Sequence, residues 1–217
     1  MPGQCPDSVA HTAGDVPSMH FCWHLATAAV LLLGAHNPAR GEVVSSTEVV
    51  YFDVVGRTPA EIYRNIMDRG PRIGGNKALA SIGTRTVQDG RIVQTGDHCA
   101  ITDYTITLQF VIRRPRITNE DVLSGTDRAL WRDMNAFIEF HENEHKEVWH
   151  ACAVKLDKTI SALKAPSCDE VAQTADGLWR KMLADCDAKQ RSYDVEQARQ
   201  LMRQPFMQRA REGAGER

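Results

Sequence analysis

The sequence predicts an α+β fold in which an antiparallel β-sheet with one short helix is followed by a long C-terminal helical hairpin. Residues 43–117 contain runs of β-branched and aromatic side chains with turn residues between them, which favours strands. Residues 119–204 instead carry apolar residues at helical spacing, interrupted at Pro166. The composition is that of an ordinary globular protein, so residues 43–204 are expected to form a single domain.

The first half of this domain is expected to begin with a strand and the short helix. Residues 48–55 are rich in β-branched and aromatic side chains, which favours a strand. A capping box then extends from Thr58 to Glu61, with Pro59 at the first helical position. This pattern predicts a helix over about 59–69.

A hairpin and a long strand are expected next. Residues 87–93 place strand-forming side chains on both sides of Asp89-Gly90, and this dipeptide favours a tight turn. Residues 100–112 are expected to form a long strand. From Ile106 onward its apolar residues alternate, so one face of the strand is expected to be buried.

The second half is expected to be two long antiparallel helices joined by a tight turn. The apolar spacing predicts a first helix from about 126 to about 164, ended by Pro166. A second capping box, from Ser167 to Glu170, predicts that the next helix spans about 168–200.

Both ends of the chain are expected to lie outside the folded domain. Residues 1–40 are expected to be a leader, with Met19 as a candidate for the true start. The apolar run 25–35 is too short to cross a membrane as a helix, but it has the length of a signal-peptide core. A buried N-terminal helix is the alternative. The tail 205–217 is polar and rich in arginine, so it is expected to be flexible.

The most informative motif is His141-Glu142-Asn143-Glu144-His145 within the first long helix. His141 and His145 are one helical turn apart and share a face, so two imidazole nitrogens can meet one Zn²⁺. Glu142 is the expected general base for a water held by that metal. The motif therefore predicts a zinc-dependent peptidase that hydrolyses peptide bonds.

The third metal ligand has to come from another part of the fold. If the hairpin is folded about Pro166, Asp187 on the second helix lies level with His145. Asp194 is seven residues further along and shares the face of Asp187. Either carboxylate is expected to complete the zinc shell, and His98 from the β-region is a further candidate. Tyr193, beside the expected ligand face, is a candidate hydrogen-bond donor to the oxyanion.

Four cysteines follow residue 40, and an even count in an oxidising compartment predicts two disulfides. Cys168 and Cys186 cannot pair on one straight helix, because they would lie about 27 Å apart along its axis. The hairpin places residue 180 level with Cys152, about 9 Å axially from Cys186, so this pair needs some shift in register. Cys99–Cys168 with Cys152–Cys186 is still the pairing with the fewest objections. Four buried thiols are the alternative.

Several stretches together resemble a bacterial family of unknown function described as predicted secreted zinc-dependent proteases. The resemblance runs from about Val49 to Tyr193. The stretches that carry it are Tyr51–Ile62, Met67–Pro71, Cys99–Thr102 with the following strand, the histidine motif, Ser167-Cys168 and Tyr193-Asp194. It implies a zincin-like domain and an exported, periplasmic or secreted, zinc protease.

Two departures from the family pattern concern the site. Family members usually have glycine at the position of Glu144, which here adds a carboxylate close to the metal helix. Members also continue after Tyr-Asp into a Thr-x-His-Gly segment, where this chain has Gln197, Arg199 and Gln200. If the family's histidine binds metal, Asp194 is the residue expected to replace it.

The expected partner is a peptide or protein substrate. The net charge of −2 and the lack of a basic stripe argue against nucleic acid, and no stable membrane span is expected once the leader is removed. An exported protein with a degenerate, non-catalytic metal site that binds a partner is the main alternative. A protein that binds no metal is a third reading, which metal analysis of the purified protein separates from the other two.

Overall fold

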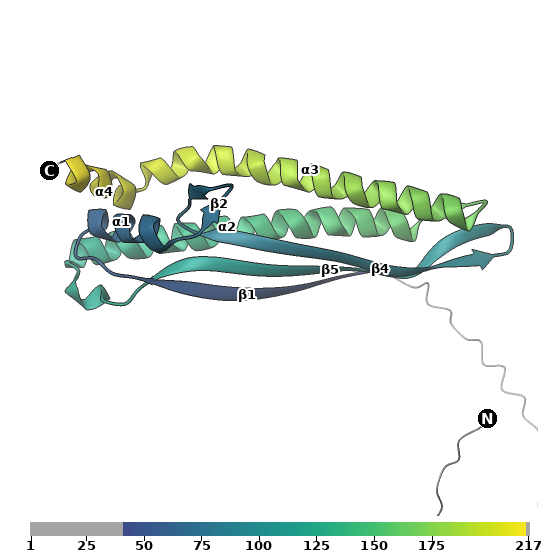
Figure 1. Ribbon diagram of the computed structural model, residues 1–217, viewed down its shortest axis with the longest axis horizontal. Coiled ribbons are helices and arrows are strands. Elements are labelled where there is room, and N and C mark those ends of the chain that lie inside the picture. Colours follow the sequence, from purple (N-terminus) through teal and green to yellow (C-terminus); the bar gives the residue numbers. More distant parts are fainter. Residues whose placement is uncertain (1–40, 216–217) are drawn as a thin grey trace, which may run out of the picture. The chain divides into compact units, whose positions relative to one another are not determined.

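The structure, a computed structural model, describes residues 41–215 (Figure 1). These residues form a β-sheet with two long helices on one side, together with three shorter helical segments, and so confirm the α+β class. The expected leader, including Met19, lies outside the described residues. Within the described residues, no helix is long and apolar enough to cross a membrane.

Three long strands make up the sheet in the order β1-β5-β4, with bounds β1 (Glu42–Val54), β4 (Ser81–Thr95) and β5 (His98–Ile117). β4 and β5 are antiparallel, as expected, and the short strand β6 (Lys164–Ala165) is antiparallel to β5. However, β1 runs parallel to β5, so the sheet is mixed rather than purely antiparallel. Parallel neighbours need a long crossover, and the residues between β1 and β5 supply it.

The predicted turn at Asp89-Gly90 is wrong. These residues lie inside β4, where the register with β5 shifts between Asp89 and Arg91 and forms a bulge. A Cβ atom at Gly90 would stand 3.1 Å from the side chains of Ile101 and Tyr104, which is tighter than an ordinary contact. The turn lies instead at Gly96-Asp97, and Gly96 has a φ of 63°.

The predicted helices form close to their expected bounds as α1 (Pro59–Arg69), α2 (Gly125–Ser161) and α3 (Cys168–Arg203). Thr58 caps α1 and Ser167 caps α3, each accepting a hydrogen bond from the backbone N–H three residues on. Smaller elements complete the fold, namely β2 (Arg72–Ile73), β3 (Asn76–Lys77) and a 3₁₀ turn, η1 (Glu120–Val122).

The segment expected to be a flexible tail forms a further helix, α4 (Pro205–Gly215). Phe206, Met207 and Ala210 are buried, and the Phe206 ring packs 5.8 Å from that of Trp131 on α2. The prediction failed because it rested on composition: the segment has several arginines and few apolar residues, although those few share one face of the helix. The burial of that face against α1 and α2 is what holds it in place.

The two larger of the three hydrophobic clusters both include residues of α2. One joins Tyr104, Ile106, Leu108 and Phe110 of β5 to the C-terminal half of α2 and to α3. The other joins α1, the N-terminal half of α2 and α4. The two long helices lie on the same side of the sheet (Figure 1). The cavity described below is lined by residues from both of these clusters.

The structure contains the expected pair of disulfides. Cys99 and Cys168 join β5 to the start of α3, with Cα atoms 5.0 Å apart. Cys152 and Cys186 join α2 to α3, with Cα atoms 6.4 Å apart. Because disulfides persist in oxidising compartments, they indicate a protein that works outside the cytoplasm.

Candidate metal centre

Three side chains from two helices converge on one point. His141 and His145 project from the same face of α2, and Asp194 approaches them from α3. The two Nε2 atoms are 3.1 Å apart. The Asp194 Oδ1 atom lies 3.0 Å from Nε2 of His145 and 3.4 Å from Nε2 of His141.

The triangle formed by these three atoms fits one small metal ion. In a tetrahedral Zn²⁺ site with bonds of roughly 2.0–2.1 Å, neighbouring ligand atoms are about 3.3 Å apart. All three edges of the triangle lie close to that length, and two imidazole nitrogens with one carboxylate oxygen are ligands that zinc accepts. Among the described residues this group offers three ligand atoms.

The pairing of the two helices decides which carboxylate joins the histidines. A tight turn at Pro166 would set residue 180 opposite Cys152, but the residue bonded to Cys152 is Cys186, six residues further along α3. Residues 162–167 do not turn at once, because β6 within them first pairs with Cys99 and Ala100 of β5. The first turns of α3 therefore extend past the end of α2 and have no part of α2 opposite them.

The same shift moves the acidic partner of the histidines. Asp194 reaches them, whereas Asp187 lines the neighbouring cavity and is not part of the ligand group. His98 stands at the far hairpin, where its Nδ1 lies 3.1 Å from Asp97, and it does not approach the site. Of the candidate third ligands, the structure thus brings only Asp194 to the pair.

The carboxyl group of Glu142 is buried beside the ligands. The residue is 4% exposed and lines the same cavity as His141 and His145. Burial raises the pKa of Glu142, and the nearby histidines and Arg114 oppose that rise. A carboxyl group whose pKa is moved toward neutrality is suited to accept and return a proton.

Nearby charges and hydrogen bonds shift the pKa values of Asp194 and His145. Burial acts to raise the pKa of Asp194, but hydrogen bonds from His141 and His145 outweigh it and hold that pKa well below its usual range. Burial acts to lower the pKa of His145, but the hydrogen bonds to Asp194 and Gln190 outweigh it, so the net shift is upward. The pocket therefore favours a charged carboxylate facing positive charge, the arrangement that a bound cation also satisfies.

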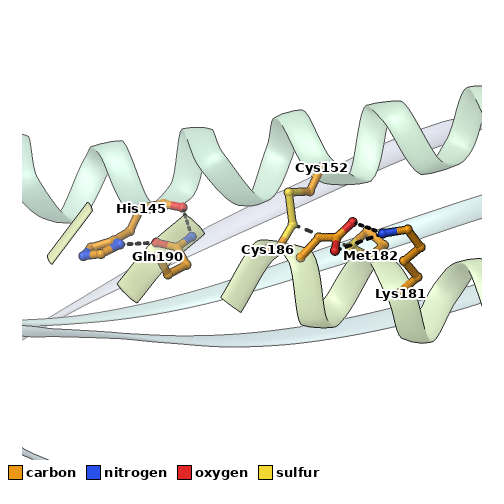
Figure 2. Close-up of a disulfide and its surroundings, with 7 residues drawn as sticks. His145, Cys152, Lys181, Met182, Cys186 and Gln190 are labelled. Atoms are coloured by element: carbon orange, nitrogen blue, oxygen red, sulfur yellow. Dashed lines mark hydrogen bonds and ion pairs between the residues drawn. A yellow bond between two sulfur atoms is a disulfide. The ribbon is translucent and has the colours of Figure 1, made fainter. Parts of the chain in front are cut away.

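Gln190 is a functional candidate that the sequence reasoning missed. Its Oε1 faces Nδ1 of His145, and its Nε2 donates a hydrogen bond of 2.9 Å to the His145 backbone carbonyl (Figure 2). When Nδ1 carries the proton, Nε2 keeps the lone pair that a metal needs. Gln190 precedes Asp194 by one helical turn, and that spacing was the available signal.

Tyr193 lies against the ligands, as its place in the sequence suggested. Its ring stacks on His141 with a centroid distance of 5.1 Å and meets His145 edge-on at 5.1 Å. The hydroxyl is buried and has no hydrogen-bond partner within the described residues. Burial, followed by the negative charge of Glu144, raises the pKa of Tyr193 to about 12, so the hydroxyl keeps its proton near neutral pH.

A cavity of about 560 Å³ opens beside the ligands. Its walls come from α1, the β2–β3 hairpin, the start of β4, α2, α3 and α4. His141, Glu142, His145, Gln190 and Asp194 line it together with many apolar side chains. This volume is in the range of pockets that bind small molecules or a few residues of a peptide.

Comparison with known proteins supplies one family and no detailed relative. The chain matches a family of bacterial proteins of unknown function, DUF922, over residues 49–200. That range runs from β1 almost to the end of α3 and includes the whole ligand group. No curated protein and no solved structure matches the chain. The chain belongs to the bacterial protein family of unknown function DUF922.

Proposed function

We propose that this protein is an exported zinc-dependent peptidase of a bacterial periplasm or cell exterior. The observation that carries the proposal is the triangle of His141, His145 and Asp194, with the buried carboxyl group of Glu142 beside it. The two disulfides support export, because such bonds are rare in the cytoplasm.

The ligands would hold the ion, and the remaining groups would handle the substrate. A bound Zn²⁺ would supply a Lewis acid and would lower the pKa of water toward about 7. Glu142 would take a proton from the attacking water and return it to the leaving amide nitrogen. Tyr193 does not line the cavity, so its ring, which stacks on His141, would hold that ligand in place rather than contact the substrate.

The edge of the sheet offers a place for an extended substrate. β4 pairs with β5 on one side, while Ser81, Ile82 and Thr84 at its start line the cavity beside the ligands. Free backbone N–H and C=O groups on such an edge can pair with an added peptide strand. A peptide bound there would run past the metal ligands, which favours a peptide over a small amide as substrate.

The experiment compares Glu142→Gln with Glu147→Gln, an exposed position on the same helix. We expect the parent and both variants to bind about one equivalent of Zn²⁺. Peptide cleavage should fall by roughly 10²–10⁴-fold in Glu142→Gln alone. Zinc content by elemental analysis and cleavage of a mixed peptide library are measured on the same preparations. Equal cleavage by Glu142→Gln and the parent would exclude this role for Glu142.

The non-catalytic alternative predicts a closed metal shell. A structural zinc site uses four protein ligands, whereas the ligand group in the described part of the chain supplies three. X-ray absorption spectroscopy of the zinc-loaded protein distinguishes the two. Four protein ligands and no exchangeable position would support a structural or partner-binding protein.

A further inference from the structure

The cavity beside the ligands has two chemically different ends. At one end lie His141, His145 and Asp194. At the other end, large apolar side chains dominate, and we call them the apolar wall: Met67, Ile73, Leu79, Phe137, Leu201 and Met202. Ile73 is 56% exposed and Met202 42% exposed, so these two side chains present apolar surface to solvent. Met67, Leu79 and Leu201 line the cavity and also pack against the core formed by α1, α2 and α4.

The apolar wall lies at a distance from the ligands that suits a peptide. Phe137 precedes His141 by four residues on α2, which is about 6 Å along the helix. Leu201 follows Asp194 by seven residues on α3, which is about 10 Å. Because an extended chain advances about 3.3 Å per residue, these distances correspond to two or three residues of a bound peptide.

A buried polar atom marks the boundary between the two ends. Gln197 is 8% exposed and lines the cavity, and its Oε1 has no hydrogen-bond partner among the described residues. A buried unpaired carbonyl oxygen is costly unless a ligand supplies a donor. An extended peptide entering the cavity would bring backbone N–H groups to this position.

Charge in the cavity does not favour a charged side chain at the apolar wall. Lys77 is the charged lining residue from the β2–β3 hairpin, and its Nζ pairs with Asp68 at 3.1 Å. The acidic lining residues Glu142, Asp187 and Asp194 come from the part of the helices nearer the ligands. Methionine side chains in the wall adapt their shape to different apolar groups.

We propose that the apolar wall is a specificity subsite for a large apolar side chain, aliphatic or aromatic, of a peptide. That residue lies within about three positions of the bond that is cut. The inference rests on the proposed peptidase function for its direction along the substrate, but binding at the subsite is a separate property that can be measured without cleavage.

The test measures binding with the zinc-loaded Glu142→Gln protein, which is expected to leave peptides intact. The probes are blocked tetrapeptides of alanine in which one position at a time is Leu, Phe or Lys. We expect Leu or Phe at one position to lower the Kd at least about tenfold relative to the all-alanine peptide. Lys at that position should give no gain. Isothermal titration calorimetry supplies the Kd values.

A matched pair of variants assigns the preference to this cavity. Ala198 lies on exposed α3 surface and lines the cavity, while Ala184 is exposed on the same helix and does not line it. Methionine is a good helix former, so neither Ala198→Met nor Ala184→Met should unfold the helix. Ala198→Met should bring the Leu-to-Ala ratio of Kd values close to one, and Ala184→Met should leave it unchanged.

The outcomes separate this inference from the peptidase proposal. Equal Kd values for all peptides, the absence of any peptide binding, or an unchanged preference in Ala198→Met would overturn the subsite. Selective binding without cleavage by the parent protein would retain the subsite and overturn the peptidase. Cleavage by the parent protein without any side-chain preference in binding would retain the peptidase and overturn the subsite.

Discussion

The interface between α2 and α3 has two halves that are built in opposite ways. Toward the hairpin connection, Cys152, Met182 and Cys186 are buried, and a disulfide joins the helices. Two turns away, the same interface holds His145 and Gln190 (Figure 2). Asp194 joins them there, and this part of the interface opens into the cavity. One half fixes how the helices pair, and the other uses that pairing to hold polar groups in place. A protein can keep an open, charged site on two helices when an adjacent closed segment prevents them from sliding.

The largest effect on the open half should come from removing a metal ligand. His145→Ala deletes one of the three proposed ligands, so the Kd for Zn²⁺ should rise more than about a hundredfold, above the range for outer partners. His150 is exposed on the same helix, and His150→Ala should leave the Kd within a factor of two or so. Competition with a chelating dye measures both. An equal loss in the two variants would place the zinc elsewhere.

The second effect concerns the residue that orients a ligand. Gln190→Ala removes the acceptor at His145 Nδ1, and we expect the zinc affinity to fall roughly 10–100-fold. Gln190→Glu keeps an acceptor at that place and should recover most of the loss. Lys189→Ala, on the exposed side of α3, is the control. If Gln190→Glu binds zinc as weakly as Gln190→Ala, the hydrogen bond to His145 is not the reason.

The third prediction concerns how removal of a disulfide from the closed half affects zinc binding in the open half. Removal of either disulfide, as Cys152→Ala with Cys186→Ala or as Cys99→Ala with Cys168→Ala, should cost about 2–4 kcal/mol of unfolding free energy. Only the first pair lies in the α2–α3 interface, so only its loss should also weaken zinc binding, by severalfold. Chemical denaturation and zinc titration of both double variants make the comparison. A matching loss of zinc affinity in both would mean that the coupling is not local to this interface.

The smallest expected effect is that rising pH weakens the His145–Asp194 attraction in the metal-free protein but strengthens the stabilisation by zinc. The pKa of His145 is raised above 6.5 and that of Asp194 is lowered below 3.8, so their attraction stabilises the metal-free protein between those values and fades as His145 loses its proton at higher pH. Zinc needs the deprotonated imidazole, so its contribution grows as pH rises. From pH 6 to pH 8, the zinc-induced increase in Tm should therefore grow relative to a sample with chelator. A constant Tm difference across that range would contradict it.

Local patterns in the sequence were sufficient for α1, α2, α3 and the histidine pair. The caps at Thr58 and Ser167 and the spacing of His141 and His145 act within a few residues, so they can be recognised without a fold. The helix α4 was missed because its apolar residues are few and become informative only when a surface receives them. The turn was misplaced because a glycine after an aspartate suits a bulge as well as a hairpin, and pairing with β5 decides between them.

The sequence by itself determined that two histidines and a glutamate share a long helix and that a second helix returns past them with acidic residues. Only the tertiary structure decided that Asp194, rather than Asp187, meets the histidines and that Gln190 holds one of them. Helical periodicity is set by hydrogen bonds between residues four positions apart, so it can be recognised from short stretches of sequence. The pairing of the helices depends on where residues 162–167 join the sheet and on the Cys152–Cys186 bond, which are contacts between distant parts of the chain.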